Sequence, residues 1–156
     1  MNPVKLIISF CLFTFISFNS YGKTHVYDVN EDIASRGEEL INKFMEGLRV
    51  RDFERSIKEV LPYFHKSMKS KYGDDITRDL RLYGFKKAHR GALRYQFPVK
   101  LTLIRKVIYR RDLGEKGQEY DFFIKKTSNY NGYPAPVKVF HHEGSDKLTI
   151  SYIGSI

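Results

Sequence analysis

Cysteine is almost absent from this chain of 156 residues. The single one, Cys11, lies in the middle of an apolar run, between Phe10 and Leu12. A lipoprotein cysteine sits behind small residues at a cleavage point, so we do not expect a lipid anchor here. The rest of the chain can form no disulfide, no thiolate metal site and no cysteine nucleophile. It therefore depends on packing to hold its fold.

Long apolar runs are equally scarce. The run from Leu6 to Phe18 has about 13 residues, whereas a helix needs about 20 to span a bilayer. Lys5 precedes this run, and the small residues Ser20 and Gly22 follow it. A charged start, a short apolar middle and a small-residue cleavage site are typical of a secretory signal peptide. We expect an exported protein, periplasmic or secreted, cleaved near Gly22 and with no transmembrane segment in the mature chain.

The predicted organisation is a signal peptide over 1–22, a leader over 23–30 and a single α+β domain over 31–156. Without residues 1–22 the chain has 26 Lys and Arg against 18 Asp and Glu, a net charge of +8. The excess is confined to residues 49–111, where 18 basic residues face six acidic ones. Basicity is thus a property of the middle segment.

Helical periodicity dominates the first half. Asn30 is placed to cap a helix of about 18 residues, and Asp52 to cap a second one. Pro62 predicts a kink at Leu61 or a new helix start. A shorter third helix is expected from a cap at Asp74 or Asp75 to Gly84, where the glycine ends it.

From Leu93 the apolar period changes to two, which predicts strands. A long first strand reaches about residue 110, and three more are expected over 118–126, 136–142 and 148–152. Glu119 and Asp121 alternate with the apolar set and should face outward. Short turns between the strands predict an antiparallel meander. The fold class is α+β, with two to three N-terminal helices packed on a curved four-stranded sheet.

This order of elements resembles the nuclear transport factor 2-like, or cystatin-like, cone superfamily. Residues 40–64, LINKFMEGLRVRDFERSIKEVLPYF, are similar to its opening helical hairpin. The resemblance concerns the fold, covers about residues 31–153, and implies helices in the concave face of the sheet. Its members include isomerase- and dehydratase-like enzymes as well as non-enzymatic binding domains, so the fold alone does not assign a function.

In such a fold the concave face can form a pocket. The tyrosines that share the apolar parity of the strands are its predicted lining: Tyr95, Tyr109, Tyr120 and Tyr152. His141 has the same parity and is the candidate acid or base, although its carboxylate partner would have to come from a helix, for example Glu46. We expect the tyrosines and His141 to have structural roles more often than catalytic ones, and we expect no cofactor.

A metal site is not predicted. His141 and His142 are adjacent, so on a strand they point to opposite faces. His65 and His89 fall on separate helical segments, and the chain has no His-x₃-His or His-Glu-x-x-His spacing.

The basic middle segment is the strongest residue-level signal. The candidate anion-binding residues are Lys100, Arg105, Lys106, Arg110 and Arg111. Rows of cations attract polyanions, which outside the cytoplasm include sulfated glycans, lipopolysaccharide, anionic headgroups and acidic proteins. Nucleic acid is not expected, because the chain is exported and carries no known reading motif. A solvated basic surface is the simpler interpretation.

Three hypotheses follow. The first is an exported, non-enzymatic binding domain with a pocket for a small amphipathic ligand or peptide and a basic patch for an anionic partner. The second is a pocket enzyme of isomerase or dehydratase type that uses His141. The third is a structural, envelope-associated interaction protein without a pocket.

Overall fold

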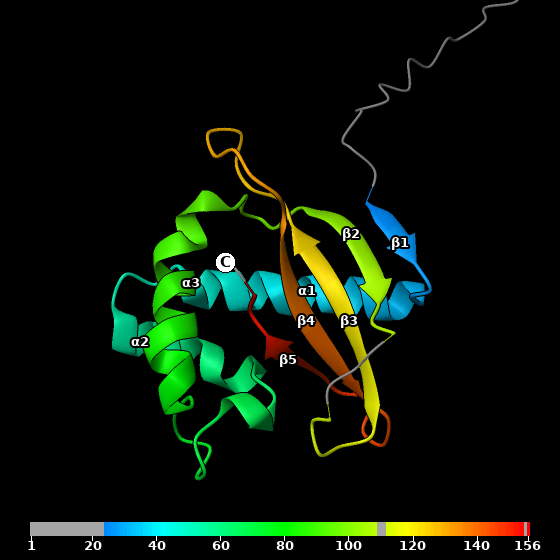
Figure 1. Ribbon diagram of the computed structural model, residues 1–156, viewed down its shortest axis with the longest axis horizontal. Coiled ribbons are helices and arrows are strands. Elements are labelled where there is room, and N and C mark those ends of the chain that lie inside the picture. Colours follow the sequence, from blue (N-terminus) through cyan, green and yellow to red (C-terminus); the bar gives the residue numbers. More distant parts are fainter. Residues whose placement is uncertain (1–23, 109–111, 155) are drawn as a thin grey trace, which may run out of the picture.

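The computed structural model describes residues 24–108, 112–154 and 156, and it has an α+β fold in which helices lie against one face of a sheet (Figure 1). The helices are α1 (Glu31–Leu48), α2 (Phe53–Val60) and α3 (Lys86–Gly91). The strands are β1 (His25–Tyr27), β2 (Leu101–Lys106), β3 (Gly117–Ile124), β4 (Ala135–His142) and β5 (Leu148–Tyr152). The α+β class is therefore confirmed. The predicted signal peptide lies outside the described residues. Among the residues that are described, no helix is long and apolar enough to cross a membrane.

The first two helices begin where their caps predict. The Asn30 side chain accepts a hydrogen bond from the amide of Asp32, and Asp52 accepts one from the amide of Arg55. Each side chain satisfies an amide that lacks a partner in the first helical turn. Helix α2 ends at Val60, and Pro62 lies in the 3₁₀ turn Leu61–Tyr63 that follows.

The third helix lies later in the chain than predicted. A π-helical turn over Leu80–Phe85 leads into α3 and a 3₁₀ turn over Ala92–Arg94, so Gly84 lies inside the helical segment. The buried positions Phe85, Ala88 and Ala92 are three and four residues apart and form the inward stripe. Basic side chains between them concealed this stripe from the sequence analysis.

The sheet has five strands in the order β1-β2-β3-β4-β5. Strands β2 to β5 form the predicted antiparallel meander, but β1 adds a parallel edge strand from the segment expected to be a leader. Three residues are too few to show an alternating pattern, which is why β1 was missed. Strand β2 is also shorter than predicted and begins only after Pro98, which has no amide to donate to a ladder.

Helix α1 crosses the sheet at very close range. Gly37 faces the fully buried ring of Phe122 on β3, and a Cβ at Gly37 would lie 2.6 Å from its Cε1 atom. The side chains around this crossing, among them Ile41, Phe44 and Val139, are completely buried. The space between α1 and the sheet is therefore filled by side chains.

Gly37→Ala tests this crossing. Alanine favours a helix over glycine, but its methyl group would collide with Phe122, so we expect a loss of about 1–3 kcal/mol in the free energy of unfolding. Urea denaturation measures it, with Ser35→Ala on the exposed side of α1 as control. The double variant Gly37→Ala/Phe122→Leu should lose less free energy of unfolding than the two single variants lose in sum. A Gly37→Ala protein as stable as the parent would contradict the close packing.

Candidate functional site

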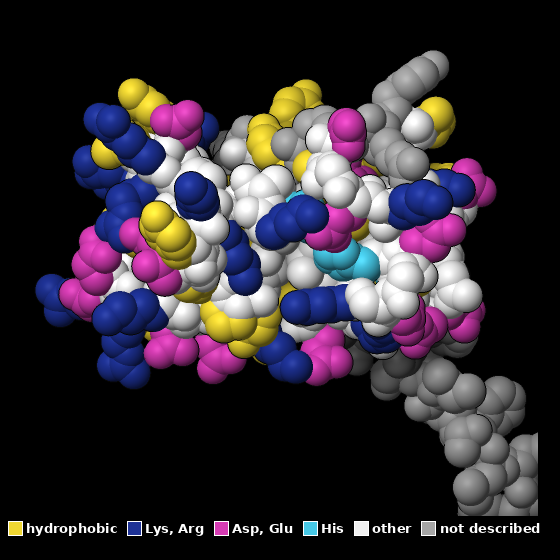
Figure 2. All heavy atoms as spheres, turned by 90° about the horizontal axis from the view of Figure 1, so that it is seen from below, with side chains coloured by type: hydrophobic (Ala, Val, Ile, Leu, Met, Phe, Trp, Pro, Cys, Tyr) yellow, Lys and Arg dark blue, Asp and Glu magenta, His cyan; other side chains and the backbone are white. Residues whose placement is uncertain are grey.

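The cations of the helical layer surround one cleft. Its lining includes five basic side chains, Lys86, Lys87, Arg90, Arg94 and Lys126, with Leu82, Tyr83, Gly91, Tyr95 and Ile156. The volume is about 460 Å³, within the range of small-ligand sites. On the face drawn in Figure 2, the helical part of the molecule at the left carries many Lys and Arg side chains, with Asp and Glu side chains among them.

Helix α3 and the turn before it build this cleft. Lys87 and Arg90 are three residues apart on α3 and so lie on one side of the helix. The π-helical turn brings Leu82 and Tyr83 to the opening, where both are largely exposed. Short π-helical segments inside helices are frequent at functional sites.

Tyr95 forms the buried floor of the cleft. Its ring lies under the ammonium group of Lys126, with 5.9 Å between Nζ and the ring centroid. Burial raises the pKa of the Tyr95 hydroxyl, which therefore stays neutral and adds no negative charge to the site. Arg94 lies over Tyr130 at 5.7 Å, so aromatic rings orient two of the five cations.

Described Asp and Glu side chains do not line the cleft. Within the described ranges, Lys86, Lys87 and Arg90 form no ion pair, and the cleft is lined by no Asp or Glu side chain. Elsewhere acids are engaged: Glu54 and Asp75 both bind Arg81 and raise its pKa. The charged side chains that line the cleft are therefore all positive, and the main chain of Ile156 lies against Gly91 in the same lining.

The anion-binding residues predicted from the sequence lie elsewhere. Arg105 and Lys106 are consecutive on β2 and point to opposite faces of the sheet. Arg105 lies 3.1 Å from the buried carboxylate of Asp121, which also binds Lys138 at 2.7 Å. Lys100 precedes β2 and is exposed. Arg110 and Arg111 lie outside the described residues.

The predicted tyrosine lining is dispersed. Tyr95 is in the basic cleft, Tyr120 is buried in the core on β3, and Tyr152 is 42% exposed at the end of β5. Tyr109 lies outside the described residues. A register shift between β4 and β5 places Tyr152 opposite Lys138, so its parity differs from the one predicted.

The face of the sheet away from α1 is partly buried. Glu119 and Asp121 do lie on this face, as their parity predicts, but they are only 1% and 5% exposed. Ser151 donates a hydrogen bond of 2.6 Å to Glu119. The predicted face of these two acids is therefore correct, but their burial does not follow from parity, which identifies a face and not what covers it.

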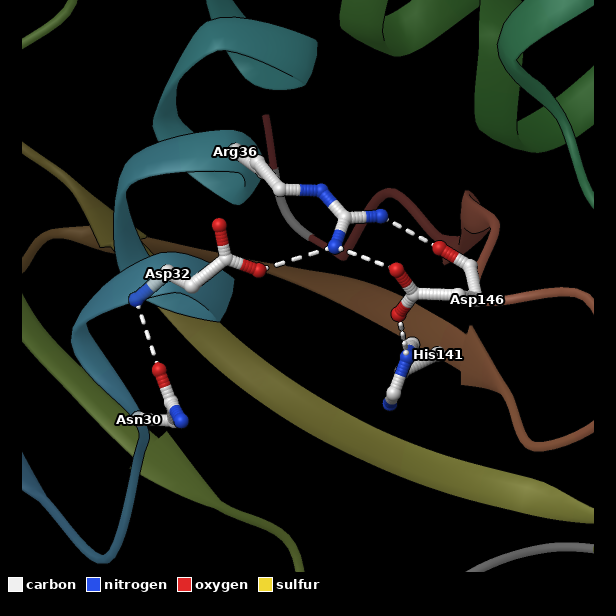
Figure 3. Close-up of polar contacts among 5 residues, drawn as sticks. All are labelled: Asn30, Asp32, Arg36, His141 and Asp146. Atoms are coloured by element: carbon white, nitrogen blue, oxygen red, sulfur yellow. Dashed lines mark hydrogen bonds and ion pairs between the residues drawn. The ribbon is translucent and has the colours of Figure 1, made fainter.

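His141 is held in a polar network and not in a deep pocket (Figure 3). Its Nε2 lies 2.6 Å from Asp146 Oδ1, in the turn between β4 and β5. Asp146 also binds Arg36 of α1, through its carboxylate at 3.0 Å and through its main-chain oxygen. Arg36 in turn binds Asp32, four residues earlier. This network fastens the β4–β5 turn to α1.

His142, Glu115 and His65 meet on the opposite face, which the sequence analysis did not foresee. Each offers one donor atom, and these atoms lie within 4.8 Å of one another. The hydrogen bond from Lys66 lowers the pKa of Glu115, and burial lowers that of His65. No spacing rule finds this cluster, because each residue comes from a different part of the chain.

Comparison with known proteins gives no identification: no family model, no curated protein and no solved structure matches this chain. The candidate sites are therefore assessed on their geometry alone.

Asp146→Asn tests the network around His141. Hydrogen bonds from His141 and Arg36 lower the pKa of Asp146 below its ordinary 3.8. A lowered carboxyl pKa stabilises the fold above the ordinary value, and that stability is lost as the pH falls through the folded value. The variant should thus be less stable than the parent near neutral pH, and the difference should shrink below about pH 4.

Urea denaturation from about pH 6 to about pH 3 measures this difference. Asparagine keeps the shape and tolerates the positive φ of 51° at this position. Asp79→Asn, at an exposed acid without an ion pair to any described residue, is the matched control. A constant difference at all pH values would show that the carboxylate charge has no role.

Proposed function

We propose that this protein is an exported binding domain that holds an anionic, amphipathic ligand in the basic cleft beside α3. The observation that carries this proposal is the group of five cationic side chains around one cleft that contains no Asp or Glu side chain in the part of the chain described. A cleft lined by charges of one sign raises the local concentration of ions of the opposite sign. A surface that is basic only for solubility would not require five cationic side chains to surround one cleft.

The chemistry of the lining favours a sulfate or phosphate group. Arg90 and Arg94 offer planar donors that suit two oxygens of such a group. Lys86 and Lys87 add mobile point charges at the entrance. Sulfated glycans, lipopolysaccharide phosphates and anionic headgroups present this group outside the cytoplasm, where the signal peptide would direct the chain.

The apolar part of the ligand would lie over Leu82 and Tyr83. Both are exposed large side chains next to the cations, and an exposed apolar group beside a charged cleft is typical of a site for an amphipathic molecule. The core beneath α1 is filled, so the cleft replaces the concave pocket that the sequence analysis predicted as the ligand site.

The test compares two double charge reversals. Lys87→Glu/Arg90→Glu changes the cleft, and Lys100→Glu/Lys106→Glu changes the exposed row predicted from the sequence by the same net charge. On a heparin column, we expect the cleft variant to elute at much lower salt than the control variant. Equal shifts in both would show that net charge alone governs retention and would overturn the proposal.

Calorimetry with decyl sulfate below its micelle concentration separates the amphipathic ligand from a bare polyanion. We expect the parent to bind decyl sulfate and the cleft variant to bind it at least about tenfold more weakly, since charge-assisted contacts are lost. Decyl trimethylammonium, with the same tail and the opposite charge, should not bind. Equal binding of both amphiphiles would exclude recognition of the anion.

A further inference from the structure

Three side chains that could bind a metal ion converge near the end of the sheet where β3 begins and β4 ends, at the lower right in Figure 1. His65 precedes a 3₁₀ turn, Glu115 lies in the connection between β2 and β3, and His142 ends β4. Glu115 Oε2 lies 2.6 Å from His142 Nδ1 and 3.5 Å from His65 Nε2. Neighbouring ligands of a tetrahedral zinc ion are separated by about 3.3 Å, given bonds of about 2.0–2.1 Å. The two separations from Glu115 lie on either side of this value.

The buried nitrogen of His65 points into the cluster without a partner. The His65 side chain is 0% exposed, and its Nε2 has no hydrogen bond among the described residues. A buried polar atom without a partner is costly and calls for an explanation. The separation of 3.5 Å from Glu115 is too long for a good hydrogen bond, but it suits two ligands of one ion.

The remaining nitrogen of each ring is held by a hydroxyl. His65 Nδ1 lies 2.8 Å from Ser67 Oγ, and His142 Nε2 lies 2.9 Å from Thr149 Oγ1. Both hydroxyls can accept the ring proton, which leaves a lone pair on each nitrogen that faces Glu115. The Ser67 amide also reaches His65 Nδ1, at 3.1 Å, and would give up this contact when the ring takes that tautomer. Such partners fix metal-binding rings in orientation.

An aromatic wall shields one side of the cluster, and a hollow opens on the other. Phe140 packs edge-on against both rings, at 5.2 Å and 4.8 Å between centroids. The hollow has a volume of about 530 Å³, and its lining includes Glu115, His142 and Ser145. Figure 2 shows histidine reaching the surface between acidic and basic side chains on this face.

We propose that His65 Nε2, Glu115 and His142 Nδ1 bind a divalent transition-metal ion, with zinc as the best match. Two imidazoles and one carboxylate are a set that zinc accepts, with a fourth position left for water or another ligand. The hollow gives this fourth position access to solvent. Calcium and magnesium are excluded by the two nitrogen ligands, since both prefer oxygen.

Lys66 completes the site. Its Nζ lies 2.6 Å from Glu115 Oε1, the oxygen that does not face the two imidazoles. Glu115 can therefore keep this ion pair while its Oε2 binds the ion. A ligating carboxylate is commonly held by such an outer contact. The geometry thus allows binding with little rearrangement of the surrounding side chains.

The test uses untagged purified protein that has been stripped of metal and titrated with Co²⁺ and with Zn²⁺. We expect one equivalent of Co²⁺ to give the strong visible absorption of four-coordinate cobalt, and Zn²⁺ to displace it. Glu115→Gln and His142→Gln should each weaken Zn²⁺ binding by more than about tenfold and remove the cobalt bands. Neither change alters the size of the side chain much, and thermal denaturation checks that both variants fold.

His141→Gln is the matched control. His141 is adjacent to His142, but its side chain binds Asp146 on the other face, so metal affinity should not change. Weakening by His141→Gln as large as that by His142→Gln would overturn the proposed site. So would six-coordinate cobalt spectra, or zinc binding that survives Glu115→Gln and His142→Gln. Glu115 and His142 do not line the basic cleft. Loss of zinc binding in Glu115→Gln and His142→Gln, with unchanged binding of decyl sulfate, therefore separates the two proposals.

Discussion

The contact between Gly37 and Phe122 sets the position of α1, and much of the structure depends on it. Because Gly37 has no side chain, the helix can approach the sheet closely enough for the Phe122 ring to fill the space. Arg36, the preceding residue, is then in reach of Asp146 in the β4–β5 turn. This turn follows His142 and precedes Thr149, which hold each other at 2.9 Å. A packing constraint on one face of the sheet thus positions polar groups on the other.

Distribution of the acids explains why the two candidate sites differ. Asp121 is engaged by Arg105 and Lys138, and Glu115 by Lys66. On the helical side, Glu54 and Asp75 are both bound to Arg81. The cations of α3 are left without such partners among the described residues, so their field is directed into the cleft. The proposed affinity of this region for anions rests on this uneven pairing of charges more than on the net charge.

Features of the fold that depend on residues close together in the sequence were predicted correctly. The caps at Asn30 and Asp52 act through amides two or three residues away, and the parity of β3 follows from alternation. Features that depend on contacts between distant segments of the chain were not predicted. Strand β1 pairs with the edge that β2 offers, and Glu119 is buried where Ser151 of β5 donates a hydrogen bond to it.

The candidate sites show the same division. The basic residues of the cleft are visible in the sequence as a cluster over 86–94, but Lys126 reaches them only through the fold. The proposed metal site could not be predicted, because a search for histidine spacing requires ligands on one element. His65, Glu115 and His142 instead come from three segments that meet at the edge of the sheet.

The absence of cysteine beyond residue 22 suggests a structural role for the proposed metal site at His65, Glu115 and His142. Exported small domains are often held together by disulfides, and residues 23–156 contain no cysteine that could form one. An ion bound by His65, Glu115 and His142 would link a helical segment, the β2–β3 connection and the end of β4. Links between segments that are distant in the chain restrict the unfolded state most, and metal binding to a folded site adds directly to stability. The ion would then act as the cross-link that the sequence lacks, at a place where Glu115 joins the sheet only through a loop.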